Sequence, residues 1–279
     1  MRIQQAFVSN PFEPLVARCR GSVWLLLHGL SLLAASTSSH AATAKANGFD
    51  SARLAEMSAA IEDAISRKDI PGGVLHVERQ GLIHSKVLGK RAIKPSAEPL
   101  AANTIFDAAS LTKVVACAPA IMILVERGQV SLQDPVHKHL PAFRGEGRDA
   151  ITVRSLLNHT SGLRPGIPRQ PAWSGYETGI KLAMAEKPEW PVGTRFRYSD
   201  INFILLGEIV ARASGVSLDR FVDREIYEPL GMKDTGYRPP ASLRKRIAPT
   251  EPVDGRMLRG VVHDPTARLM GGVAGHAGL

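Results

Sequence analysis

Cysteine is scarce in this chain of 279 residues, which contains only Cys19 and Cys117. Cys19 precedes an apolar run near the N-terminus, so removal of that run would leave a single thiol. A mature chain with one cysteine cannot form an internal disulfide, even in an oxidising compartment. Cys117 falls within an apolar helical pattern, and we expect it to be a small buried core residue.

Aromatic residues are also few, at 5% of the chain, although the net charge is +9. The Lys and Arg residues are dispersed and not interleaved with aromatics, which, together with expected export, argues against nucleic-acid binding. We interpret the excess as a solvated basic surface. Attraction to anionic cell-envelope polymers, giving peripheral association, is the alternative. The sequence does not indicate an oligomeric state.

Patterns of metal ligands are missing as well. His159, His263 and His276 can be imagined as ligands together with Asp264. However, they show no His-x₃-His or similar spacing of the kind found in metal sites. We therefore expect no metal and no cofactor.

The N-terminus carries a 14-residue apolar run. Ser22 to Ala35 is apolar, follows Arg18 and Arg20, and is succeeded by small residues. This pattern predicts a secretory signal peptide over residues 1–41 and hence a periplasmic or secreted protein. The run is short for a membrane span. An uncleaved signal anchor is the alternative.

The rest of the sequence predicts an α+β fold. A helix over 50–68 precedes two strands, 74–78 and 82–87, joined by a turn at Gln80-Gly81. We take 45–119 as the N-terminal part of an α/β domain, ending in an apolar helix that begins near Val114. Residues 120–250 are predicted to be a mostly helical insert. Residues 251–279 are predicted to return towards the α/β domain.

The most informative motif is Ser110-Leu111-Thr112-Lys113. At positions i and i+3 of a helical turn, a serine oxygen and a lysine nitrogen share one face and can touch. This spacing is the S-x-x-K signature of serine acyltransferases. A second copy, Ser242-Leu243-Arg244-Lys245, follows Pro239-Pro240 in a basic stretch without helical periodicity. The context therefore favours Ser110 as nucleophile and Lys113 as its activating amine.

A second element, Tyr198-Ser199-Asp200, lies on a loop directly before an apolar helix. A phenol held near cations can act as a general base. The alternative is a surface tyrosine beside an aspartate that caps the following helix. Trp173, Tyr176 and Trp190 flank the same loop, and either line a substrate cleft or serve as packing residues.

Taken in order, these motifs resemble the serine β-lactamase and penicillin-binding-protein superfamily. The closest resemblance is to its class C-like branch, which includes esterases and D-alanyl-D-alanine carboxypeptidases. The stretches Leu156 to Leu163 and Val262 to Leu279 look like further landmarks of that branch. The resemblance covers about residues 50–279 and implies an antiparallel sheet flanked by helices.

The resemblance also implies a third motif, Lys or His, then a small residue, then Gly, on a late strand. His276-Ala277-Gly278 matches by letter, but in relatives a similar Gly-rich stretch precedes the strand with the true motif. We therefore expect this match to be a decoy and the last strands of the sheet to be missing, along with one oxyanion-hole N–H. Such a donor is typically worth about 10²–10³ in rate.

The function that the resemblance implies is a serine hydrolase acting through an acyl-enzyme. Ser110 would attack, Lys113 and Tyr198 would relay its proton, and Asp200 would orient substrate or Lys113, where many relatives have Asn. The substrate would be an ester, a D-Ala-type peptide derived from peptidoglycan, or a β-lactam. The rival hypotheses are a non-catalytic relative that binds penicillin or peptidoglycan peptides, and an inactive fragment.

Overall fold

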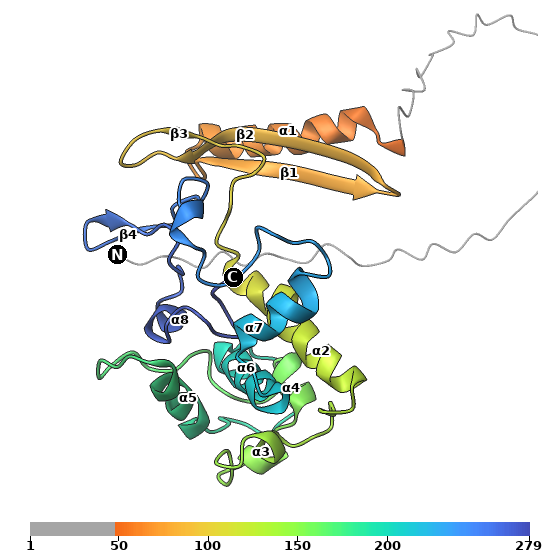
Figure 1. Cartoon of the computed structure of the whole chain (residues 1–279), viewed down its shortest axis with the longest axis vertical. Coiled ribbons are helices and arrows are strands. Elements are labelled where there is room, and N and C mark those ends of the chain that lie inside the picture. The colour runs from red at the N-terminus through yellow and green to blue at the C-terminus, as the bar shows by residue number, and fades with distance from the viewer. Residues whose placement is uncertain (1–47) are drawn as a thin grey trace, which may run out of the picture. The chain divides into compact units, whose positions relative to one another are not determined.

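The computed structural model describes residues 48–279, all of which fall in one compact unit (Figure 1). The predicted signal peptide, residues 1–41, lies outside the described residues.

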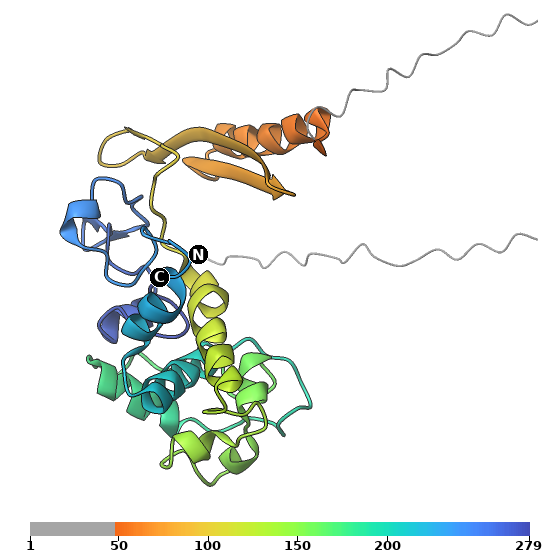
Figure 2. The same cartoon turned by 45° about the vertical axis from the view of Figure 1, so that its right-hand side comes forward.

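The N-terminal part is a helix on an antiparallel sheet, as predicted. Helix α1 (Ser51–Ser66) begins after Asp50, whose side chain accepts the N–H groups of the first turn. Strands β1 (Gly72–Arg79) and β2 (Leu82–Ala92) form a hairpin, and β3 (Glu98–Pro99) pairs with β2 in the order β1-β2-β3. Figures 1 and 2 show α1 lying along the hairpin. Both long strands exceed their predicted lengths, because pairing continues from the turn to Gly72 opposite Gly89.

The middle of the chain is mostly helical. Helix α6 (Asp200–Ser214) is its centre, since every residue from Ile201 to Val210 is buried. A helix buried on all sides lacks a polar face, and other helices therefore surround it. The core also contains the large, fully buried side chains Phe143, Phe221, Ile121, Leu124 and Leu156. The helices are α2 (Ala118–Glu126), α3 (Val136–His139), α4 (Val153–Leu157), α5 (Tyr176–Ala185), α6 (Asp200–Ser214) and α7 (Leu218–Val222).

The segment that carries the Ser-x-x-Lys motif is helical, as predicted, but the helix is not regular. A 3₁₀ turn (Ala109–Leu111) leads into a π-helical stretch (Lys113–Cys117), and α2 starts only at Ala118. Pro119 has no N–H to donate to the carbonyl four residues earlier, so the α-helical ladder cannot extend back through this point. π-helical turns are rare in proteins, and those that occur are often at functional sites.

The last part of the chain returns to the N-terminal part. A small hairpin, β4 (Pro252–Val253) with β5 (Arg256–Met257), is followed by α8 (Pro265–Leu269). An isolated parallel bridge joins Ile105 to Ile247, and Arg259 forms two hydrogen bonds with Glu98 on β3. The segment after α8 then runs alongside the Ser-x-x-Lys segment.

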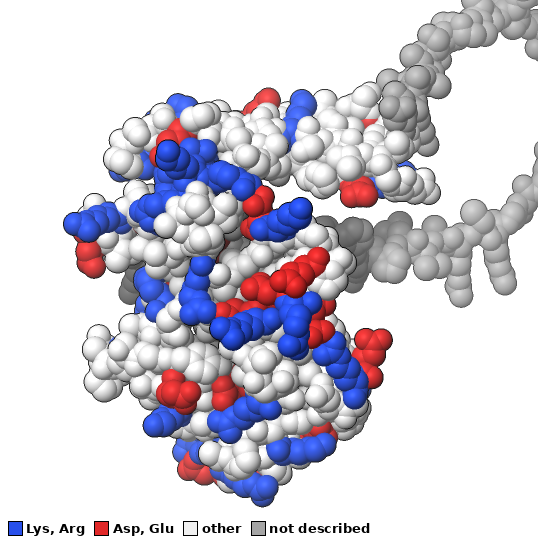
Figure 3. All heavy atoms as spheres, viewed as in Figure 1, with Lys and Arg blue, Asp and Glu red and all other residues white. Residues whose placement is uncertain are grey.

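Charged side chains of both signs are mixed on the surface. Figure 3 shows Lys and Arg interspersed with Asp and Glu on the face in view. Many of them form exposed ion pairs, among them Arg53–Glu56 and Arg67–Asp69. Such pairs contribute little to stability, and their presence fits a solvated basic surface.

Candidate active site

Ser110 and Lys113 are in contact. Lys113 Nζ lies 3.0 Å from Ser110 Oγ. Ser110 is exposed, whereas Lys113 is only 3% exposed. The pair thus combines a hydroxyl that a substrate can reach with an amine that is shielded from water. This is the arrangement needed to activate a serine nucleophile.

The backbone before Ser110 is held in an uncommon conformation. Ala109 has φ = +45°, in the left-handed region that side chains other than glycine rarely adopt. Asp107 stabilises this turn, because its carboxylate accepts the N–H of Ala109 at 2.8 Å and that of His263 at 2.8 Å. Strained residues of this kind cluster at active sites, where the surroundings keep them in place.

Lys113 Nζ has three acceptors around it. Besides Ser110 Oγ, it lies 2.8 Å from Asp200 Oδ1 and 3.0 Å from the backbone oxygen of His276. Lys113 Nζ donates hydrogen bonds to Ser110 Oγ and to the His276 oxygen, whereas its contact with Asp200 is an ion pair. The amine is therefore fixed in direction as well as in position.

Tyr198 lies beside the lysine but presents its ring rather than its hydroxyl. Lys113 Nζ is 4.8 Å from the centre of the phenol ring, which is in cation–π range. Tyr198 is 44% exposed, and no residue among 48–279 forms a hydrogen bond with its hydroxyl. The ring also packs on His159, with 4.6 Å between the ring centres.

His159 anchors the loop that carries Tyr198. Its Nδ1 accepts the N–H of Ser199 at 3.1 Å, and Asn202 Nδ2 lies 3.2 Å away. Burial, followed by the positive charge of Lys113, lowers the pKa of His159. These contacts give His159 a structural role in the loop rather than a role as a metal ligand.

Asp200 does not cap α6. The N-cap position belongs to Ser199, and Asp200 is the first helical residue, with its carboxylate on Lys113. A negative charge in the first turn also interacts favourably with the helix dipole. Of the two sequence-based alternatives for Asp200, the contact with Lys113 is the one observed.

His276 reaches the site through its backbone rather than its side chain. The side chain is 1% exposed, and Nε2 lies 2.9 Å from Asp264 Oδ1. The buried ring is thus held by Asp264, and the expectation that His276-Ala277-Gly278 is not the third motif stays a prediction. The backbone contact with Lys113 was missed, because no side-chain pattern encodes it.

The structure does gather a group of possible metal ligands. Asp200, Asp264 and His276 carry donor atoms within 4.8 Å of one another. His159 and His263, the other two histidines considered, are not part of this group. The Lys113 ammonium is already bound to Asp200 and would repel a divalent cation at this position. The donor set therefore fits a hydrogen-bonded charge cluster better than a metal.

The second Ser-x-x-Lys motif has no comparable surroundings. Ser242 and Lys245 are both exposed, and no hydrogen bond joins them among the described residues. The three aromatic residues near the Tyr198 loop pack or bond elsewhere. Trp173 donates to Pro168 O, Tyr176 donates to Glu208, and Arg197 stacks on Trp190.

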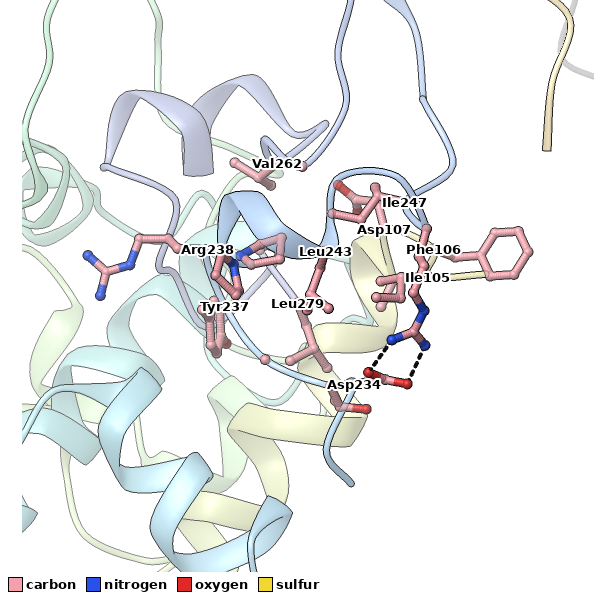
Figure 4. A pocket seen from close by; sticks show the side chains of 18 of the residues that line it. Ile105, Phe106, Asp107, Asp234, Tyr237, Arg238, Leu243, Ile247, Val262 and Leu279 are labelled. Atoms are coloured by element: carbon pink, nitrogen blue, oxygen red, sulfur yellow. Dashed lines mark hydrogen bonds and ion pairs between the residues drawn. The ribbon is translucent and has the colours of Figure 1, made fainter. Parts of the chain in front are cut away.

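A cavity of about 1200 Å³ lies next to the segment before Ser110 (Figure 4). Ile105, Asp107, Leu243 and Leu279 are among the residues that line it. Ser110, Lys113 and Tyr198 do not line this cavity. The chemistry of the site is therefore outside it.

Comparisons with known proteins agree on one family. The sequence profile of the family described as "Beta-lactamase" matches residues 57–279. A protein named "Putative D-alanyl-D-alanine carboxypeptidase" from Salmonella schwarzengrund is 30% identical over 274 residues, covering 83% of this chain. The chain spans 62% of the length of that relative.

Solved structures show the same likeness. A class C beta-lactamase superimposes with a TM-score of 0.67 at 25% identity, covering 84% of this chain and 62% of that chain. A class C beta-lactamase in complex with cefoxitin gives a TM-score of 0.64 at 26% identity, covering 75% and 58% respectively. The expected α+β fold is confirmed by these superpositions.

Proposed function

The chain belongs to the beta-lactamase family, and on this premise we propose that it is a serine hydrolase with Ser110 as nucleophile. The observation that carries the proposal is the 3.0 Å contact between the exposed Ser110 hydroxyl and the buried Lys113 amine. The reaction class is acyl transfer through a covalent acyl-enzyme. The substrate is an ester, a peptide ending in D-alanine, or a β-lactam.

The first step is the attack of Ser110 Oγ on the substrate carbonyl. In its neutral form, Lys113 has two N–H donors and one lone pair. His276 O accepts one N–H, and Asp200 Oδ1 lies 2.8 Å from Nζ as an ion-pair partner, so the lone pair is available for the Ser110 proton. The O–C bond forms as the proton moves to Lys113 Nζ. The N–H of Ser110 supplies half of the oxyanion hole.

The second step is the departure of the leaving group. Lys113 returns the proton, with Tyr198 as the relay, and the bond from the carbonyl carbon to nitrogen or oxygen breaks. The position of Tyr198 over Nζ supports this role, although its hydroxyl must turn towards the substrate. Water then attacks the acyl-enzyme, the same groups take its proton, and Ser110 is released.

The proposal extends to location and substrate source. The predicted signal peptide supports a periplasmic or secreted enzyme, where peptidoglycan-derived peptides are present. A relative named as a carboxypeptidase and a similar structure that binds cefoxitin support acyl substrates of the D-alanyl and β-lactam type. Peripheral association with the cell envelope through the basic surface is part of the same proposal.

The test is hydrolysis of a nitrophenyl ester, a D-alanyl-D-alanine peptide and nitrocefin by the purified chain. We expect Ser110→Ala to abolish hydrolysis of whichever substrate is used. Ser242→Ala, which changes the second Ser-x-x-Lys motif, is the matched control and should retain the wild-type rate. Full activity of Ser110→Ala would rule out the proposal. Stoichiometric reaction without turnover would favour the non-catalytic, penicillin-binding alternative.

A further inference from the structure

The segment Ala274-Gly275-His276 is held closely against the helices that carry the site. A Cβ atom on Gly275 would lie 2.0 Å from the backbone oxygen of Phe203 and 2.9 Å from Cys117 Sγ. Only glycine therefore allows this approach to α6 and to the π-helical stretch. Tyr237 also donates its hydroxyl hydrogen to Ala274 O at 3.1 Å. The backbone before His276 is thus fixed on several sides.

The side chain of His276 is fixed as well. Its Nε2 lies 2.9 Å from Asp264 Oδ1, and the same oxygen accepts the N–H of Ala267 at 2.7 Å in the first turn of α8. Burial alone would raise the pKa of Asp264, but the bond from His276 and the backbone N–H groups outweigh it and lower the pKa to about 2. Asp264 therefore carries a negative charge at neutral pH, which favours its hydrogen bond with the imidazole.

The side chain and the backbone oxygen of His276 thus each have a defined hydrogen-bond partner. Asp264 holds the imidazole, and Lys113 Nζ bonds the backbone oxygen at 3.0 Å. The side chain of His276 is held by Asp264, and Gly275 before it is packed against α6. The carbonyl group of His276 therefore has little freedom to rotate. The Asp264 carboxylate also lies close to Asp200, within the same group of donor atoms.

We propose that Asp264 and His276 are positioning residues that aim the Lys113 amine at Ser110 through the backbone oxygen of His276. The inference rests on the proposed function of Ser110 and Lys113. In this proposal Asp264 acts on His276, and His276 acts on Lys113, rather than on the substrate. Their effect arises because a misplacement of about 1 Å in a catalytic group can reduce the rate by about 10²-fold.

The direct test observes Lys113 rather than turnover. The ¹⁵Nζ resonance of Lys113 is assigned by its loss in Lys113→Arg and is then compared among variants of the full chain. In His276→Leu the bond to Asp264 is lost, and we expect the Lys113 resonance to shift. His276→Gln keeps a donor for Asp264 and should restore the wild-type position. His263→Leu changes an exposed neighbouring histidine and should leave the resonance unchanged.

A second measurement links position to reaction. With cefoxitin as the probe, acylation should be about 10–100-fold slower in His276→Leu and close to wild type in His276→Gln. His276→Leu is shown to be folded by cooperative unfolding. If it is not folded, Asp264→Asn, which retains an oxygen acceptor, serves as the folded variant. A neutral amide oxygen accepts a weaker hydrogen bond than a carboxylate, so the imidazole is held less firmly in this variant. Its Lys113 resonance should shift in the same direction as that of His276→Leu, by a smaller amount.

The outcomes separate the two proposals. An unchanged Lys113 resonance in folded His276→Leu or, if that variant is not folded, in Asp264→Asn overturns the positioning role. If the resonance shifts as expected but Ser110 of the wild-type chain is never acylated, the positioning role stands and the proposed function is overturned. Equal losses in His276→Leu and His276→Gln would indicate a purely structural contribution and would also overturn the inference.

Discussion

Lys113 Nζ lies 3.0 Å from the backbone oxygen of His276, which is 163 residues further along the chain. The contact connects the π-helical stretch after Ser110 with the segment after α8. The site therefore depends on the return of the chain to the nucleophile as well as on the local Ser-x-x-Lys spacing.

Replacement of Lys113 by methionine should remove the activating amine while keeping a long unbranched side chain. We expect acylation of Ser110 to fall about 10²–10⁴-fold, the usual contribution of a positioned base. Pre-steady-state kinetics with a nitrophenyl ester measures this directly. Lys245→Met, in the second Ser-x-x-Lys motif, is the control and should react at the wild-type rate. An equal effect of both substitutions would contradict the role of Lys113.

Replacement of Asp200 separates the charge of its side chain from the position of its oxygen, which lies 2.8 Å from Lys113 Nζ. Asp200→Asn retains an oxygen that can accept from Lys113, and we expect acylation within about tenfold of wild type. Asp200→Leu loses the acceptor and should slow acylation by about 10²-fold, because the amine is no longer held in direction. The same rate in both variants would show that Asp200 does not orient Lys113.

Gly275→Ala tests the close approach of the last segment to α6. The added Cβ would meet Phe203 O at 2.0 Å, so the backbone must move. We expect the free energy of unfolding to fall by about 1–3 kcal/mol, as for other overpacked sites, and acylation to slow with it. Gly166→Ala, where the added Cβ meets nothing within 4 Å, should be neutral in chemical denaturation. Equal stability of the two variants would argue against the observed packing.

The ion pairs of Glu98 should make the free energy of unfolding depend on pH. Hydrogen bonds from Arg259, then from Arg91, lower the pKa of Glu98 to about 2 from 4.5. Because the folded pKa is the lower one, its contribution is fully present above about pH 4.5 and is lost as the pH falls towards about 2.

Glu98→Gln should therefore reduce the free energy of unfolding at neutral pH by about 1 kcal/mol, the upper range for pairs that water still reaches. The difference from wild type should shrink at about pH 3. Urea denaturation at the two pH values measures it, with Glu56→Gln on the exposed face of α1 as the control. A difference that grows in acid would contradict this account of Glu98.

The sequence allowed much of the fold to be predicted. Helix α1, the β1–β2 hairpin and the helical middle were predicted from apolar periodicity and turn residues, and the structure confirms them. The π-helical stretch was not predicted. Apolar periodicity does not distinguish a π-helical stretch from an α-helix. Pro119 lacks the N–H that would bond the carbonyl four residues earlier, so it disturbs the helix one turn before its own position.

The site was predictable only where it is local in sequence. Ser110, Lys113, Tyr198 and Asp200 were identified from motifs, and the structure brings them together. The positions of the Tyr198 hydroxyl and of Asp264 were not predictable, because both depend on packing between distant segments. Gly275 permits the close approach to α6, but glycine is equally common in turns and at helix ends, so its presence alone does not predict the contact.

The most direct test of the central claim is intact-protein mass spectrometry after incubation with cefoxitin. The account predicts one covalent adduct per chain, mapped by peptide digestion to the peptide containing Ser110. The adduct should be absent in Ser110→Ala and undiminished in Ser242→Ala. No adduct on the folded wild-type chain, or an adduct that persists in Ser110→Ala, would contradict Ser110 as the nucleophile.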